Sequence, residues 1–174
     1  MFEPGERIEK VRSLVRQAGI YTRSAAPRDG SMGHHTKAGP LDPVTEADVR
    51  TEALIRDGLA RIFPDDGFWG EECGRPANPG RGRVWICDPI DGTRSFIRFG
   101  HNYCVSLGLL VEGRIVLAII FDPERNDFYE AVAGCGAFLN GRRQKIAPIP
   151  ASRLERGLGH GLYFGLFVYP NIVA

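Results

Sequence analysis

The segment at residues 85–96 reads WICDPIDGTRSF, and it restricts the possible folds of this chain more than any other stretch. The apolar residues at 84–87 predict a buried β-strand, yet Asp88 follows directly and Asp91 comes three residues later. A carboxylate at the end of a buried strand costs free energy unless it is hydrogen-bonded, paired or bound to a cation. Pro89 stiffens the backbone between the two acids, and Gly92 favours a turn before a short helix expected at 93–99. The fold must therefore bring compensating groups to this strand end.

Two longer helices are predicted before this segment and mostly antiparallel strands after it. Apolar residues recur at helical spacing in 6–18 and again in 47–62. The later strands are separated by short turns at 112–113 and at Asn140 and Gly141, and Asn-Gly is the strongest short signal for a hairpin. The expected strands span residues 68–71, 84–87, 103–111, 114–121, 127–133, 137–139 and 142–146. This order predicts an α+β fold with two N-terminal helices packed on a largely antiparallel sheet.

Charge and cysteine content exclude several classes of protein. Lys and Arg number 22 and Asp and Glu number 21, and the net charge of +1 gives no general attraction to nucleic acid or to acidic membranes. None of the four cysteines has the spacing of a zinc ribbon or a redox pair, which predicts reduced thiols and a cytoplasmic location. The charged N-terminus and the absence of a membrane-length apolar run predict no membrane partner.

The first of three acidic groups is the pair Asp88 and Asp91. A turn there could aim both carboxylates, with the Ile90 carbonyl between them, at one hard divalent cation such as Mg²⁺. The alternative is that Asp88 caps the following helix and Asp91 begins a turn. The residues alone leave both readings open.

Two further acidic groups also lie at element boundaries. Glu71 and Glu72 follow an apolar stretch, and alone they are a weak signal because most glutamate pairs are solvated. Residues 42–48 read DPVTEAD, in which Thr45 is the expected N-cap of the second helix and Asp48 its partner in a capping box. Three such groups in one small domain favour a shared site.

The three groups together resemble the motifs of the inositol monophosphatase family of Mg²⁺-dependent, lithium-sensitive phosphomonoesterases. DPVTEAD is similar to the family's D-x-V-T-x-x-D element, GEE to its acidic strand end, and WICDPIDGTRSF to its DPIDGT stretch. GCGAFLNGRRQKI at 134–146 resembles a late hairpin of the family. The resemblance implies the first half of the family's layered α/β sandwich.

The resemblance also implies roles for individual residues. The metal ligands would be Glu71, Asp88, the Ile90 carbonyl and Asp91. Gly92 and Thr93 would contact the phosphate of a small phosphorylated substrate. Asp48 and Thr93, together with Glu71, would position the attacking water as the catalytic residues, and Lys37 matches a lysine in the family's mobile loop.

The resemblance weakens toward the end of the chain. Residues 1–150 correspond to the family's N-terminal domain, and 151–174 to a truncated or divergent start of its second half. The second half carries a W-D-x-A-A-G motif whose aspartate is a further metal ligand, and this chain has no such motif. A weak or absent second metal site is therefore expected.

Three readings of the function follow. The first is a Mg²⁺-dependent phosphatase of a small polyol or sugar monophosphate such as inositol 1-phosphate. The second is a catalytically impaired or inactive member that binds metal or phosphate or pairs with another chain, and the family's dimers make a homodimer one such pairing. The third, a structural domain without a site, leaves the DPIDGT stretch unexplained.

Overall fold

The computed structural model describes residues 5–27, 35–36, 43–74 and 82–145. In these ranges the helices are α1 (Glu6–Ala25), α2 (Glu46–Ile62) and α3 (Thr93–Phe99). The strands are β1 (His35–Thr36), β2 (Pro43–Val44), β3 (Gly67–Gly70), β4 (Arg83–Asp91), β5 (Cys104–Val111), β6 (Arg114–Asp122), β7 (Asp127–Val132), β8 (Gly136–Leu139) and β9 (Arg142–Arg143). The expected order of helices, and of strands from β3 onward, is confirmed, whereas β1 and β2 lie in a stretch where no strand was expected.

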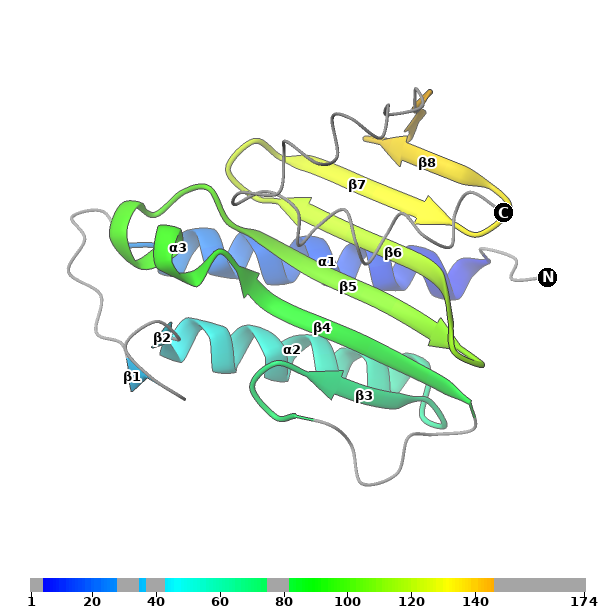
Figure 1. Ribbon diagram of the computed structural model, residues 1–174, viewed down its shortest axis with the longest axis horizontal. Coiled ribbons are helices and arrows are strands. Elements are labelled where there is room, and N and C mark those ends of the chain that lie inside the picture. The colour runs from blue at the N-terminus through cyan, green and yellow to red at the C-terminus, as the bar shows by residue number, and fades with distance from the viewer. Residues whose placement is uncertain (1–4, 28–34, 37–42, 75–81, 146–174) are drawn as a thin grey trace, which may run out of the picture.

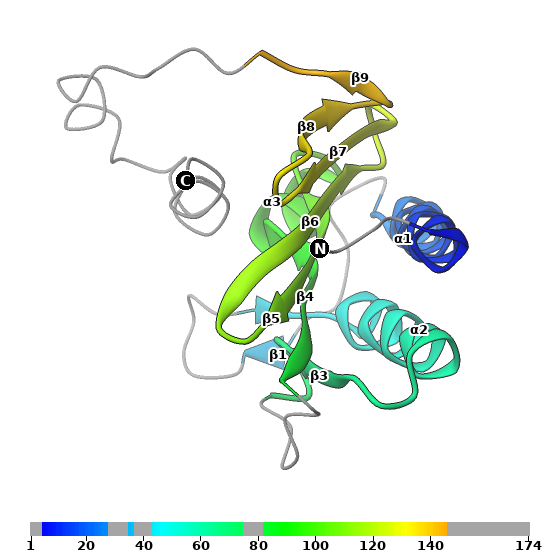
Figure 2. The same ribbon diagram turned by 90° about the vertical axis from the view of Figure 1, so that its right-hand side faces the viewer.

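One sheet runs through β3 to β9 in chain order, and β1 and β2 form a separate antiparallel pair. Within the described part of the large sheet, β3 and β4 are parallel and the other neighbouring strands are antiparallel. Both long helices, α1 and α2, cover the same face of this sheet (Figures 1 and 2). The predicted α+β architecture, with two helices on a largely antiparallel sheet, is therefore confirmed.

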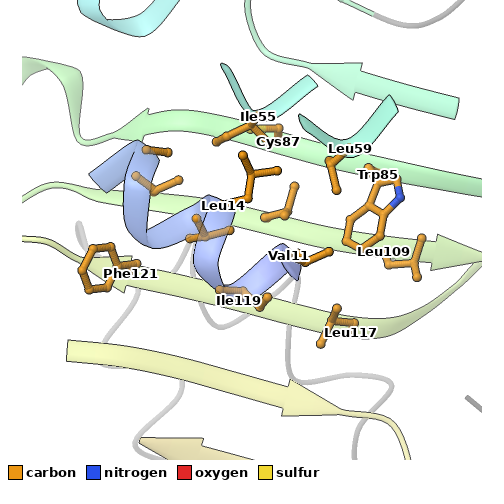
Figure 3. Packing of buried hydrophobic residues seen from close by; sticks show 14 of the residues in the cluster. Val11, Leu14, Ile55, Leu59, Trp85, Cys87, Leu109, Leu117, Ile119 and Phe121 are labelled. Carbon is orange, nitrogen blue, oxygen red and sulfur yellow. The ribbon is translucent and has the colours of Figure 1, made fainter. Parts of the chain in front are cut away.

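The core lies between the two helices and the central strands (Figure 3). Side chains of α1 and α2 such as Val11 and Ile55 are fully buried against Trp85 and Leu109 of β4 and β5. The indole N–H of Trp85 donates to a carboxylate oxygen of Asp66 at 2.9 Å, so this large side chain is buried without an unpaired polar group. Burying such apolar surface is the main favourable contribution to the free energy of folding.

Helix α1 is longer than the periodicity predicts, because it continues beyond Ala18 to Ala25. Gly19 follows Ala18 and suggests a helix end, but a Cβ at this position would lie 2.3 Å from the ring of Phe121. The glycine is therefore needed for close packing of α1 on β6, and it does not end the helix. In the same way, Gly58 of α2 allows Leu14 of α1 to approach closely.

The turn predictions are confirmed with one shortened strand. Positive φ angles occur at Glu112 and Gly113 and again at Asn140 and Gly141, as tight two-residue hairpin turns require. The last strand was expected at 142–146 and extends only over Arg142–Arg143 among the described residues. The domain division at residue 150 and the loop lysine Lys37 lie outside the described residues, so both stay predictions.

All four cysteines have free thiols, and Cys87 and Cys104 are buried. Of the helices in the described ranges, none is both long and apolar enough to cross a bilayer.

Candidate active site

The candidate site lies where β3 and β4 end. The two strands are parallel and pair Gly70 with Cys87, so their carboxyl ends lie side by side. The backbone N–H of Glu71 donates to the Cys87 carbonyl at 3.0 Å, which places Glu71 next to Asp88. Both strands point toward the end of the molecule where α2 begins and α3 lies (Figure 1). This arrangement brings the second and first acidic groups together.

A β-bulge puts Asp88 and Asp91 on the same face of the sheet. Asp88 pairs with Ser106 and Asp91 pairs with Cys104, so three residues of β4 span the same distance as two of β5. Without the extra residue, two positions three apart in a strand would point to opposite faces. The sequence prediction ended the strand at Cys87, but pairing with β5 continues to Asp91, and that boundary was wrong.

The alternative reading of Asp88 as a helix cap is also wrong. The N-cap of α3 is Gly92, and no side chain caps this helix. Asp88 instead accepts a hydrogen bond from the backbone N–H of Ile90 at 3.2 Å, within the bulge. Its carboxylate is therefore held at the strand end and is not used to start the helix.

Asp48 enters the site from the start of α2. The capping box is confirmed, because Asp48 accepts from the Thr45 N–H at 2.8 Å and the Thr45 hydroxyl accepts from the Asp48 N–H at 3.3 Å. The hydroxyl of Thr93 lies 3.4 Å from the other carboxylate oxygen of Asp48 and donates to the Ile90 carbonyl at 3.0 Å. Thr93 thus connects the start of α2 with the bulge in β4.

Gly92 joins β4 to α3 in a conformation that favours glycine. Its φ angle is +99°, in the left-handed region, and a Cβ there would lie 2.9 Å from the carbonyl oxygen of Asn102. The residue therefore allows the backbone to turn directly from Asp91 into Thr93, the first residue of α3.

The electrostatics show that the four acids share one region. Burial and the charges of Glu71 and Asp91 raise the pKa of Asp88 to about 9. Burial and the Glu71 charge also raise the pKa of Asp91. Burial raises the pKa of Asp48, with a further contribution from Glu71 and opposing hydrogen bonds from Thr45. Concentrated negative charge of this kind favours either bound protons or a bound cation.

The donor set fits a hard divalent cation by its chemistry. Carboxylates and a backbone carbonyl are the oxygen ligands that Mg²⁺ uses, and a neighbouring positive charge would lower the raised pKa values of Asp88 and Asp91. In the described ranges, however, no three His, Cys, Asp or Glu side chains are arranged closely enough to hold a metal ion. The acids are therefore neighbours in charge and position, and a bound cation would require the described carboxylates to draw closer together.

Sequence reasoning missed Glu52, a buried carboxylate that contacts the same region. Only 2% of this residue is exposed, and it accepts hydrogen bonds from the backbone of Glu72 and Cys73. A signal existed, because Glu52 falls on the inner face of α2, four residues after Asp48 and three before Ile55. An acid on the apolar face of a helix needs a partner inside the protein.

A second polar feature lies apart from the acids. A groove of about 470 Å³ is lined by residues of α1, β7 and β8, including Arg12 and Glu130. Arg12 makes two hydrogen bonds of 2.6 Å to the Glu130 carboxylate, so both charges are already compensated. None of the site residues above lines this groove.

Comparisons with known proteins find similar chains and folds. Residues 5–163 match the profile of the inositol monophosphatase family. A histidinol-phosphatase from Chlorobaculum parvum is 49% identical over 62% of this chain and 41% of its own length. An inositol-1-monophosphatase from Bacillus subtilis is 32% identical over 86% of this chain and 56% of its own length. The crystal structure of the extragenic suppressor protein suhB from Bartonella henselae aligns with a TM-score of 0.75 at 28% identity, over 82% of this chain and 55% of that chain. The chain thus spans about half the length of these relatives.

Proposed function

The chain belongs to the inositol monophosphatase family, and we propose that it is a Mg²⁺-dependent phosphomonoesterase acting on a small polyol or sugar monophosphate such as inositol 1-phosphate. One observation carries the proposal: the parallel pairing of β3 with β4 and the bulge in β4 gather Glu71, Asp88 and Asp91 at one strand end, where burial and the Glu71 charge raise the pKa values of Asp88 and Asp91. Acids so placed are costly without a function that uses their charge.

The metal would be held by carboxylates and one carbonyl. These are Glu71, Asp88, the Ile90 carbonyl and Asp91. A bound Mg²⁺ would supply a water molecule of lowered pKa and would stabilise the charge that develops on the phosphate oxygens. The bulge in β4 keeps Asp88 and Asp91 on one face, and the parallel pairing of β3 and β4 places Glu71 beside them.

The remaining residues would orient the substrate and the water. Gly92 and Thr93 would contact the phosphate at the start of α3. The Thr93 hydroxyl donates to the Ile90 carbonyl and would accept a hydrogen bond from a water molecule through a lone pair. Asp48, held by the capping box with a carboxylate oxygen 3.4 Å from this hydroxyl, would position the water together with Glu71.

The substrate, location and assembly are further parts of the proposal. The named relatives include a histidinol-phosphatase and inositol-1-monophosphatases, so a small phosphorylated alcohol is the expected substrate class. Free thiols fit a cytoplasmic location. A homodimer stays a prediction.

The test is release of inorganic phosphate by the purified 174-residue chain, with Mg²⁺ and with EDTA. The substrates are inositol 1-phosphate, histidinol phosphate and 2′-AMP. Mg²⁺-dependent release that Asp91→Asn abolishes and Asp57→Asn leaves intact supports the proposal, since Asp57 is exposed on α2. A folded chain that binds Mn²⁺ and releases no phosphate would instead support the alternative of a binding member without turnover.

A further inference from the structure

The buried carboxylate of Glu52 is compensated by the turn that carries Glu71. Glu52 accepts the backbone N–H of Glu72 at 2.7 Å and that of Cys73 at 2.8 Å, one on each carboxylate oxygen. These two N–H groups belong to the residues directly after Glu71, at the end of β3. Hydrogen bonds from N–H groups to a buried carboxylate are short and stronger than those between neutral groups.

Gly70 makes room for this contact. A Cβ at Gly70 would lie 2.2 Å from one carboxylate oxygen of Glu52 and 2.6 Å from the other. The φ angle of Gly70 is not positive, so its backbone conformation does not require glycine. Glycine is required here because the Glu52 carboxylate leaves no room for a side chain. The end of β3 therefore lies directly against the carboxylate.

The backbone around Glu71 is fixed from two sides. On one side its own N–H donates to Cys87 of β4 at 3.0 Å. On the other side Glu52 of α2 holds the next two N–H groups. The turn closes with the N–H of Gly74 donating to the Gly70 carbonyl at 3.0 Å. The position of the Glu71 backbone is thus set jointly by a strand and a helix.

We propose that Glu52 is a positioning residue, which holds the turn so that the Glu71 carboxylate faces Asp88 and Asp91. Asp48 lies four residues earlier on the same face of α2. Helix α2 therefore positions Asp48 directly, and it positions Glu71 through the contact of Glu52 with the turn. The role of Glu71 as a metal ligand, and therefore the purpose of positioning it, rests on the proposed metal-dependent function. The contact between Glu52 and the turn does not depend on that function.

Two substitutions disturb the contact in different ways, and both are made in the full chain. Glu52→Gln keeps the shape and one acceptor oxygen, but its NH₂ group meets a backbone N–H. Gly70→Ala keeps the carboxylate and displaces it by contact with the new methyl group. Asp57→Asn is the matched control, because Asp57 is an exposed acid on the same helix.

The first readout is hydrogen exchange of individual backbone amides by NMR, in EDTA. We expect the amides of Glu72 and Cys73 to exchange about tenfold faster or more in both variants, while amides of β5 stay protected. If these two amides exchange as slowly in both variants as in wild type, the proposal is overturned, whatever Mn²⁺ affinity the variants have.

The second readout is Mn²⁺ affinity, measured from the EPR signal of free Mn²⁺. Loss of residues that orient ligands typically lowers metal affinity about 10–100-fold, and we expect this loss in both variants and none in Asp57→Asn. Variants with faster amide exchange and Mn²⁺ affinity equal to wild type would show a purely structural role and would refute the positioning role. A wild-type chain that binds no Mn²⁺ would contradict the proposed function, while the exchange data would still decide whether Glu52 holds the turn.

Discussion

Asp88→Asn is predicted to stabilise the metal-free protein at neutral pH. The neighbouring acids and burial raise the pKa of Asp88 from 3.8 to about 9. The unfolded chain loses this proton near pH 4 and the folded chain keeps it until about pH 9, so the unfolded chain binds fewer protons between these values. Stability therefore falls as the pH rises through this window. An asparagine carries no charge, and its side-chain oxygen still accepts the Ile90 N–H.

The magnitude follows from the pKa difference. At pH 7 the full difference corresponds to about 4 kcal/mol, at 1.36 kcal/mol for each pH unit above the unfolded pKa. Asp88 is only partly buried, and solvent access together with sharing of the proton among the acids reduces this to about 2 kcal/mol. For a chain of this size the melting temperature would rise by about 4–8 °C.

The assay is thermal unfolding of wild type, Asp88→Asn and the control Asp57→Asn, in EDTA at pH 4 and pH 7.5. The stabilisation should be present at pH 7.5 and nearly absent at pH 4. With Mg²⁺ at about a thousand times its dissociation constant, wild type gains about 4 kcal/mol and becomes the more stable protein. An Asp88→Asn variant that is less stable than wild type in EDTA, or a difference that does not depend on pH, would refute the reasoning.

Three other substitutions test separate contacts. Gly92→Ala should lower the free energy of unfolding by about 1–3 kcal/mol in urea titrations, because the new Cβ meets the Asn102 carbonyl at a positive φ angle. Arg12→Met should cost about 3 kcal/mol at neutral pH, because it leaves the buried Glu130 carboxylate unpaired; the free energy of unfolding in urea measures this. Thr93→Val should reduce Mg²⁺-dependent phosphate release about a hundredfold or more while lowering the free energy of unfolding by only about 1 kcal/mol.

The parts of the fold that were predictable depend on local chemistry. The capping box of Thr45 and Asp48 involves residues three apart on one helix turn, so its sequence pattern suffices. The Asn140-Gly141 hairpin is similar, because both residues adopt positive φ angles that few others tolerate. The order of helices and strands followed from such local signals.

The parts that were missed depend on contacts between distant segments. The bulge that aligns Asp88 with Asp91 exists because β5 continues to pair past the proline, and periodicity within β4 contains no sign of its partner. The length of α1 was underestimated because the apolar spacing was followed only to Ala18, whereas Gly19 continues the helix and packs against the ring of Phe121.

The motifs predicted that the acidic residues lie close together, but they did not predict the contacts that hold them there. The motifs indicated the acidic residues, and the structure brings Asp48, Glu71, Asp88 and Asp91 into one region, because the Glu71 charge contributes, after burial, to the raised pKa values of the three aspartates. The role of Glu52 could not be predicted, because its partners are backbone N–H groups twenty and twenty-one residues away. Every residue except proline has a backbone N–H group, so the sequence does not indicate which of these groups will bind a buried carboxylate.

The most direct test of the central claim is to locate a bound Mn²⁺ ion by paramagnetic broadening in NMR spectra of the full chain. Substoichiometric Mn²⁺ should broaden the amide signals of Glu71, Asp88 and Asp91 first, and Asp91→Asn should weaken the effect. The groove that contains Arg12 and Glu130 should be unaffected. Broadening that begins in that groove, or that spreads evenly over surface acids, would contradict a metal site at the ends of β3 and β4.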